Sequence, residues 1–213
     1  MAAACSETDL LLKCSRDEER RKLLAEFFIQ YRDRLKLMVQ LRLFEPLKGR
    51  VDPSDVVQDA YVEAMQRLGA YLAERPMPLF AWLRRLTGQK LIDCVRMHVG
   101  AQIRDVRRER SIDQDPMPHT TAVGLANCLA YGGPTPSEAA IRAERMQQVR
   151  EALERMEPLD RDVLALRHFE HLSNTEIALE LGIDQSTASR RYLRALQALK
   201  RAVAGASGEV EER

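Results

Sequence analysis

The sequence predicts an all-α protein of two small helical domains joined by a flexible linker, the C-terminal domain being a helix-turn-helix. Apolar residues recur three and four positions apart over most of the 213 residues, which is typical of helices with one buried face. Runs of alternating Val, Ile, Thr and aromatic residues hardly occur, so strand signals are scarce. A segment rich in proline and glycine separates two helical stretches, and long structureless loops are uncommon inside one domain. The expected parts are an N-terminal lead-in at 1–22, a first domain at 23–110, a linker at 111–137, a second domain at 138–204 and a tail at 205–213.

The first domain is expected to contain three helices. One runs from Leu23 to about Leu43 and is ended by Pro46 and Gly49. The next begins at Asp52-Pro53-Ser54, where a proline suits the first turn and an acid suits the positive end of the helix dipole. The third, at about 79–98, carries Trp82 among its apolar residues, and large aromatics usually supply buried area. We therefore expect Trp82 to be a core anchor rather than a base-stacking residue.

The second domain is expected to begin at about Ser137, with helices before and after Pro158. At 172–191 the chain then reads as a short helix, a tight turn at Gly182 and a second helix. Glycine suits the left-handed residue that ends a helix, and Asp184 or Ser186 can cap the helix that follows. Five basic residues and no acidic one lie between 185 and 208: Arg190, Arg191, Arg194, Lys200 and Arg201. A helical hairpin with a solvated basic face is the alternative, but the glycine turn and the missing acids favour contact with DNA.

The overall composition excludes several classes of protein. Lys and Arg number 33 against 32 Asp and Glu, but acids cluster near 52–63 and bases near 84–110 and 190–201, a distribution that suits separate nucleic-acid and protein surfaces. The four cysteines are scattered, and the His168 and His171 pair has no further ligands, so we expect no metal and no cofactor. No phosphate loop or nucleophile motif indicates an enzyme. No membrane-spanning run or signal-peptide pattern occurs, so a soluble cytoplasmic protein is expected.

Two segments of the first domain give the helix-turn-helix a more specific context. They are Asp55-Val56-Val57-Gln58-Asp59-Ala60-Tyr61, and Phe80-Ala81-Trp82-Leu83-Arg84-Arg85-Leu86 with Asp93 and Arg96 eleven and fourteen residues after the tryptophan. With these segments and the pattern at 172–195, the chain resembles bacterial RNA polymerase sigma factors, and among them the extracytoplasmic-function class of the sigma-70 family. The resemblance covers about residues 24–110 and 138–203.

The resemblance implies a protein that is not itself an enzyme but binds core RNA polymerase and promoter DNA, and it leaves open an anti-sigma factor as a further partner. The implied core polymerase contacts are Asp55, Val56, Gln58 and Asp59. The implied contacts with the promoter −10 element are Gln89, Lys90, Asp93 and Arg96. The implied contacts with the −35 element are Ser186, Thr187, Ser189, Arg190, Arg191 and Arg194.

Some of these positions have an alternative reading. Asp93 is equally compatible with a surface ion pair, and Arg191 and Arg194 with phosphate contacts that carry no sequence information. Members of the family often have Asn at the position of Gln89 and Lys at that of Ser189, so the promoter sequence is expected to differ from a typical one. For the whole chain, one alternative is a helix-turn-helix regulator that does not bind core polymerase. The other is a protein-interaction or anti-sigma adaptor module, which leaves the basic helix unexplained.

Overall fold

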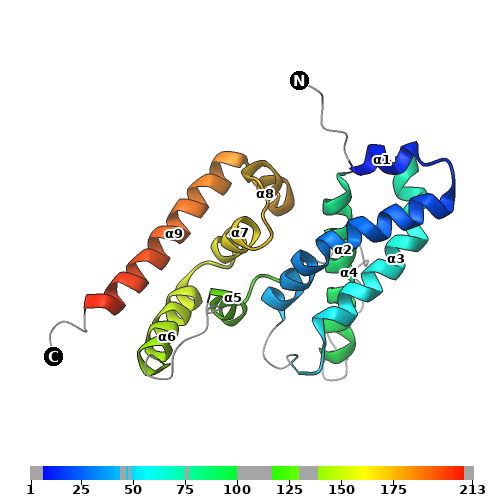
Figure 1. Ribbon diagram of the computed structural model, residues 1–213. Coiled ribbons are helices and arrows are strands. Elements are labelled where there is room, and N and C mark those ends of the chain that lie inside the picture. The colour runs from blue at the N-terminus through cyan, green and yellow to red at the C-terminus, as the bar shows by residue number, and fades with distance from the viewer. Residues whose placement is uncertain are drawn as a thin grey trace. The chain divides into compact units, whose positions relative to one another are not determined.

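The computed structural model describes residues 7–43, 47, 49–74, 77–99, 117–129 and 139–208, and within these ranges it contains nine α-helices (Figure 1). The predicted all-α class is confirmed. Contacts divide the chain into two compact units, Met1–Val39 with Pro46–Met117, and Gln40–Glu45 with Pro118–Arg213. Each unit is described by itself. The end of the predicted first domain, at 100–110, and the last part of the predicted tail, at 209–213, lie outside the described residues.

The first unit contains helices α1 (Glu7–Lys13), α2 (Asp17–Arg42, to Val39 in this unit), α3 (Pro53–Glu74) and α4 (Leu79–Val99). Aromatic side chains join α2 to its neighbours: the rings of Phe28 and Tyr61 lie 4.8 Å apart, and those of Tyr31 and Phe80 also lie 4.8 Å apart. Helices α3 and α4 pack against each other along their apolar faces. These contacts fix α3 and α4 as a pair, so functional side chains on both helices have a defined spacing.

Trp82 lies in the core of the first unit, which confirms its predicted role as an anchor. Only 7% of the residue is exposed, and its ring stacks on that of Tyr71 with 4.3 Å between the centroids. The hydroxyl of Tyr71 donates to the carbonyl oxygen of Met77 at 3.0 Å, which ties the start of α4 to α3. The indole is therefore enclosed by protein.

The N-terminal lead-in differs from the expectation. Helix α1 occupies part of it, with Leu11 buried, and a hydrogen bond of 2.8 Å joins Thr8 Oγ1 to Tyr71 Oη on α3. Helix α2 begins at Asp17 instead of near residue 23, because three acids in its first turn favour the positive end of the helix dipole. A seven-residue helix is unstable alone, so its formation depends on contacts with α3 that local sequence does not show.

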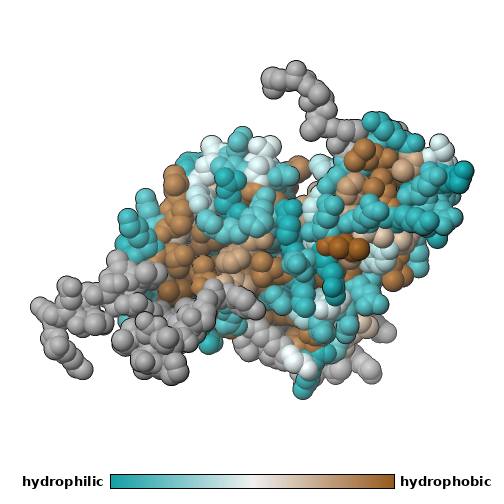
Figure 2. All heavy atoms as spheres, viewed as in Figure 1, coloured by the Kyte–Doolittle hydropathy of each residue, from teal (hydrophilic) through white to brown (hydrophobic). Residues whose placement is uncertain are grey.

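The second unit contains helices α5 (Ala122–Leu129), α6 (Ala139–Arg155), α7 (Pro158–His168), α8 (Asn174–Leu181) and α9 (Gln185–Gly208). Helix α9 packs against α6, α7 and α8. Figure 2 shows apolar atoms gathered between α9 and the helices α6 and α7. The core includes Leu153, Leu166, Ile177 and Ala195, all of which are buried completely. Three helices thus support the inner face of α9.

Helix α5 lies inside the segment 111–137 that was expected to be a flexible linker, and this expectation needs correction there. Helix α5 packs against α6 and α7, and Leu125 is buried. Just before it, the backbone NH of Thr120 donates to Asp162 Oδ1 at 2.7 Å, and Arg161 Nε donates to the carbonyl oxygen of Thr120 at 3.1 Å. The eight-residue apolar run of α5 is too short to show a clear period among the surrounding prolines and glycines.

Within the described ranges, no helix combines the length and the apolar character that crossing a membrane requires. The same ranges contain no group of three or more His, Cys, Asp or Glu side chains placed to hold a metal ion.

Candidate nucleic-acid interface

Helix α8 of the predicted helix-turn-helix is fixed at both of its ends. At its start, Ser173 Oγ accepts from the backbone NH of Glu176 at 3.3 Å, while Glu176 Oε2 accepts from the backbone NH of Ser173 at 2.8 Å. This reciprocal capping box satisfies two amides that lack partners in the helix. At its end, Gly182 has φ +63°, and the backbone NH of Ile183 donates to the carbonyl oxygen of Ala178 at 3.0 Å. The turn into α9 is therefore set by its own sequence, as predicted.

Asp184, one of the two predicted capping residues, caps the N-terminus of α9. Its Oδ1 accepts from the backbone NH of Thr187 at 2.8 Å, and its carboxylate also accepts from the hydroxyls of Ser186 and Thr187 at 2.5 Å each. These hydrogen bonds hold the pKa of Asp184 well below its usual range. An ionised carboxylate thus stands at the tip of α9.

The six residues predicted for the −35 contact differ in how they face solvent. Ser186, Arg190 and Arg194 are exposed, whereas Thr187, Ser189 and Arg191 are half-buried. Ser189 points toward α8, since its Oγ accepts from Asn174 Nδ2 and donates to the carbonyl oxygen of Gln185, both at 3.0 Å. Arg190 Nη2 donates to Thr187 Oγ1 at 3.0 Å along the outer side of the helix. The structure therefore brings only part of this set to one accessible face.

Arg191 and Arg194 are paired with two acids at the start of α7. Asp160 Oδ2 accepts from Arg194 Nε at 2.7 Å, and Asp160 Oδ1 accepts from Arg194 Nη2 at 2.9 Å and from Arg191 Nη1 at 2.8 Å. Glu157 Oε2 accepts from Arg191 Nη1 at 2.8 Å and from Arg194 Nη2 at 3.2 Å. We refer to Glu157, Asp160, Arg191 and Arg194 as the Asp160 cluster.

The electrostatics of the Asp160 cluster favour its charged form. Burial alone would raise the pKa of Asp160, but hydrogen bonds and charge from Arg194 and Arg191 outweigh it, so the pKa lies below its usual value. In turn, Glu157 and Asp160 raise the pKa values of Arg191 and Arg194. Sequence reasoning missed Glu157 and Asp160, which stand 31 to 37 positions from their partners. The signal available was an acidic first turn in the helix before the helix-turn-helix.

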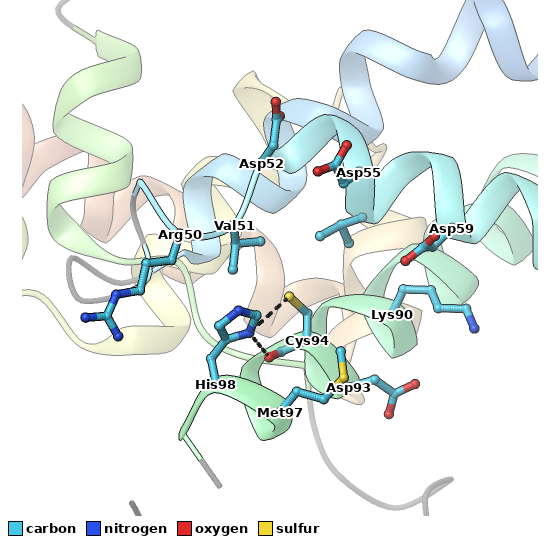
Figure 3. A pocket seen from close by; sticks show the side chains of 11 residues that line it. Arg50, Val51, Asp52, Asp55, Asp59, Lys90, Asp93, Cys94, Met97 and His98 are labelled. Atoms are coloured by element: carbon cyan, nitrogen blue, oxygen red, sulfur yellow. Dashed lines mark hydrogen bonds between the residues drawn. The ribbon is translucent and has the colours of Figure 1, made fainter. Parts of the chain in front are cut away.

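In the first unit, a hollow of about 380 Å³ between α3 and α4 brings together residues predicted for two different partners (Figure 3). Asp55, Val56 and Asp59 line it from α3, and Lys90 and Asp93 line it from α4. Asp55 and Asp59 are exposed, whereas Val56 is buried, so the two aspartates are the residues of the predicted polymerase contact that are accessible in this hollow. Asp52 adds a fourth carboxylate to the lining, and Arg50 adds a second basic side chain beside Lys90, so acids outnumber bases in what we call the acidic hollow.

Gln58 lies apart from Asp55 and Asp59. It lines a second hollow, of about 340 Å³ between α2 and α3, together with Phe28, Ile29, Val57 and Tyr61. Ile29 is one of the large apolar side chains that remain exposed. We refer to the exposed residues Asp55, Gln58 and Asp59 as the exposed ridge of α3. This ridge has the acidic hollow on one side and the largely apolar hollow on the other.

Of the residues predicted for the −10 contact, Lys90 has a defined partner in the protein. Its Nζ donates to Glu63 Oε2 on α3 at 3.1 Å, and this hydrogen bond contributes most to holding the pKa of Glu63 below its usual value. Gln89, Asp93 and Arg96 are half-buried on α4. Glu63 is a second acid that sequence reasoning did not single out.

Cys94 and His98 also line the acidic hollow, as Figure 3 shows. His98 Nδ1 lies 2.8 Å from the carbonyl oxygen of Cys94 and 3.8 Å from its Sγ. Burial and the negative charge of Asp59 raise the pKa of the Cys94 thiol. The thiol is therefore mainly protonated at neutral pH, which disfavours it as a nucleophile.

One family of known proteins matches the second unit. Residues 146–199, which include part of α6, all of α7 and α8 and most of α9, match the family model described as region 4 of sigma-70. No curated protein matches the chain. The matched residues include the capping box, the Gly182 turn and the whole Asp160 cluster, so the features that position α9 are those of this region. The second unit therefore resembles region 4 of sigma-70.

Proposed function

We propose that this protein is a sigma factor of the extracytoplasmic-function class, which binds core RNA polymerase in the cytoplasm and directs promoter recognition, DNA opening and transcription initiation. The observation that carries the proposal is the region 4 match over a helix-turn-helix with Ser186 and Arg190 on its exposed face. The polymerase performs the chemistry in this proposal, and the sigma factor supplies binding and position only.

In this proposal, α9 enters the major groove of the −35 element. A helix fits that groove, and residues near its N-terminus are the ones that reach base edges in helix-turn-helix proteins. Arg190 carries a guanidinium that is able to donate two hydrogen bonds to a guanine, and Ser186 is exposed one turn before it. Affinity also comes from phosphate contacts, for which Lys200 and Arg201 are exposed farther along α9.

The first unit serves the polymerase and the −10 element in the same proposal. Asp55 and Asp59 are exposed one helical turn apart on α3, where they would meet basic side chains of the polymerase. Gln89, Lys90, Asp93 and Arg96 lie on α4, which we assign to the −10 element. Two units that each bind one promoter element raise the effective concentration of the second contact once the first has formed.

The test is run-off transcription with purified core polymerase, the full-length protein and a promoter library. We expect initiation at promoters that core polymerase alone ignores. If no new start site appears, the sigma assignment fails. Sequence-specific binding by the protein alone, as a dimer on palindromic sites, would then support the alternative of an independent helix-turn-helix regulator. Binding to another sigma factor without DNA binding would support the adaptor alternative.

A further inference from the structure

We propose that Arg191 and Arg194 are positioning residues that hold the recognition helix α9 on α7 through Asp160, and that base readout at the −35 element belongs to Ser186 and Arg190. This inference rests on the proposed promoter-binding function. It assigns four of the six residues predicted for the −35 contact to two groups: Arg191 and Arg194 support the helix, and Ser186 and Arg190 read bases.

The geometry of Arg191 directs its guanidinium inward. Only 22% of its side chain is exposed, and Nη1 donates to both Glu157 and Asp160 at 2.8 Å. Its Nε is also buried. An N–H group that already donates to a buried carboxylate has to leave that carboxylate before it can reach a phosphate. Arg191 is therefore placed to connect α9 to α7.

Arg194 holds the same carboxylate from the next turn of α9. Its side chain is 54% exposed, but Nε and Nη2 face the two oxygens of Asp160 at 2.7 and 2.9 Å. A fork of two parallel hydrogen bonds fixes direction as well as distance. Two arginines on successive turns that share one carboxylate restrain both the rotation of α9 about its axis and its position along α7.

The charges within the Asp160 cluster balance one another. Two guanidinium groups face two carboxylates, so the cluster presents little net positive charge to a DNA backbone. Salt dependence of DNA binding arises from cations that replace condensed counterions on phosphates. We therefore expect Arg191 and Arg194 to contribute little to the salt dependence. Arg190 differs from them, because it is exposed and its side-chain partner is the neutral hydroxyl of Thr187.

A masking role for the acids would give the opposite result from a positioning role. If Asp160 only held Arg191 and Arg194 away from phosphates, removal of its charge would leave the two arginines with Glu157 as their one remaining acid in the cluster, raise the net positive charge there and tighten DNA binding. If Asp160 positions α9, removal of its charge loosens the helix and weakens binding. The substitution Asp160→Asn keeps the size of the side chain and removes its charge, so it separates the two roles by the sign of the effect.

The experiment measures binding of the full-length protein with core polymerase to promoter duplexes at several salt concentrations, with the preferred −35 sequence or a scrambled one. We expect Asp160→Asn and Arg194→Gln each to weaken binding to the preferred promoter by about tenfold. The slope of log K against log salt should stay unchanged for both. Arg190→Ala is the matched control on the exposed face, and it should relax the base preference at one −35 position.

Two further variants separate positioning from loss of folding. Glu157→Gln alters the 61% exposed acid, so it should fold normally and give a smaller loss of the same kind. The double variant Asp160→Asn with Arg194→Gln should bind about as well as the weaker single variant, because each change by itself already removes the ion pair between Asp160 and Arg194. Circular dichroism and thermal unfolding establish that each variant is folded at the binding temperature.

Three results would each overturn the inference. The first is tighter DNA binding by Asp160→Asn, and the second is a slope of log K against log salt that is smaller by about one in Arg194→Gln. The third is a base preference altered at one −35 position in Arg194→Gln. A wild-type protein that gives no −35-dependent binding would overturn the proposed function together with this inference. Wild-type −35 dependence with any of the three results overturns the inference alone.

Discussion

The carboxylate of Asp160 and the guanidinium of Arg194 meet side by side, with Oδ2 to Nε at 2.7 Å and Oδ1 to Nη2 at 2.9 Å. Side chains from α7 and α9 are thereby joined across 34 positions of sequence. Because the aspartate is nearly buried and the arginine is half exposed, the pair belongs to the supported inner side of α9. Its protonation state therefore affects stability as well as orientation.

Stability is expected to fall at low pH in a manner that depends on Asp160. Its pKa in the folded protein lies below the value of about 3.9 in an unfolded chain, so the unfolded state takes up the proton first. The stabilisation is present above pH 3.9 or so and is lost as the pH falls through the folded pKa. Urea unfolding of the wild type and of Asp160→Asn between pH 6 and pH 3 measures the difference, which should shrink toward low pH. A difference that stays constant over this interval would contradict the prediction.

Removal of the cap on α8 should destabilise the protein by about 1 kcal/mol. Ser173→Ala deletes the oxygen that accepts from the backbone NH of Glu176, and that amide loses its partner. Equilibrium unfolding in urea gives the change in the free energy of unfolding. Thr175→Ala, at an exposed position in the same first turn, is the control and should change stability far less. An equal effect of the two substitutions would exclude capping as the cause.

Charge reversal on the exposed ridge of α3 should weaken binding to core polymerase. Asp55→Arg combined with Asp59→Arg replaces two exposed carboxylates by cations, and we expect at least about a tenfold loss, mainly in the association rate. Biolayer interferometry with immobilised core polymerase measures both rate constants. Glu74→Arg, at the exposed far end of the same helix, is the control. A comparable loss from the control would point to net charge instead of a local contact.

Trp82 should act through stability rather than through direct contact with DNA. Trp82→Ala removes a ring that is stacked on Tyr71 in the core, and we expect the free energy of unfolding to fall by about 3–5 kcal/mol. Trp82→Phe keeps an aromatic ring and should cost less. Thermal and urea unfolding give the comparison. Normal stability of Trp82→Ala together with lost promoter opening would show that the indole contacts DNA directly.

Much of the architecture could be predicted because local patterns determine it. Asp184 and Gly182 have short-range signals, and each occupies the predicted place. Helices α1 and α5 were not foreseen, since seven and eight residues are too few for a sustained apolar period. Their stability comes from packing on neighbouring helices, and a single sequence does not show those neighbours.

The candidate site could be predicted in composition but not in orientation. Helical periodicity predicts that Asp55 and Asp59 share a side of α3, and both line the same hollow. The same reasoning did not separate Gln58, which faces a different hollow next to α2. Likewise, the basic character of α9 was visible, but the acids that pair with Arg191 and Arg194 come from another helix. Pairing between distant segments depends on tertiary packing, and local sequence patterns do not show which helices pack together.

The separation of α9 into a supported face and an exposed face has an evolutionary consequence. Substitutions at Ser186 and Arg190 change groups at the surface and leave the core and the Asp160 cluster in place. Duplicated copies of such a gene would then be able to acquire new target sequences through a few amino-acid substitutions, and every intermediate variant would still fold. The same separation gives protein engineers two positions to randomise when they need regulators that do not cross-react.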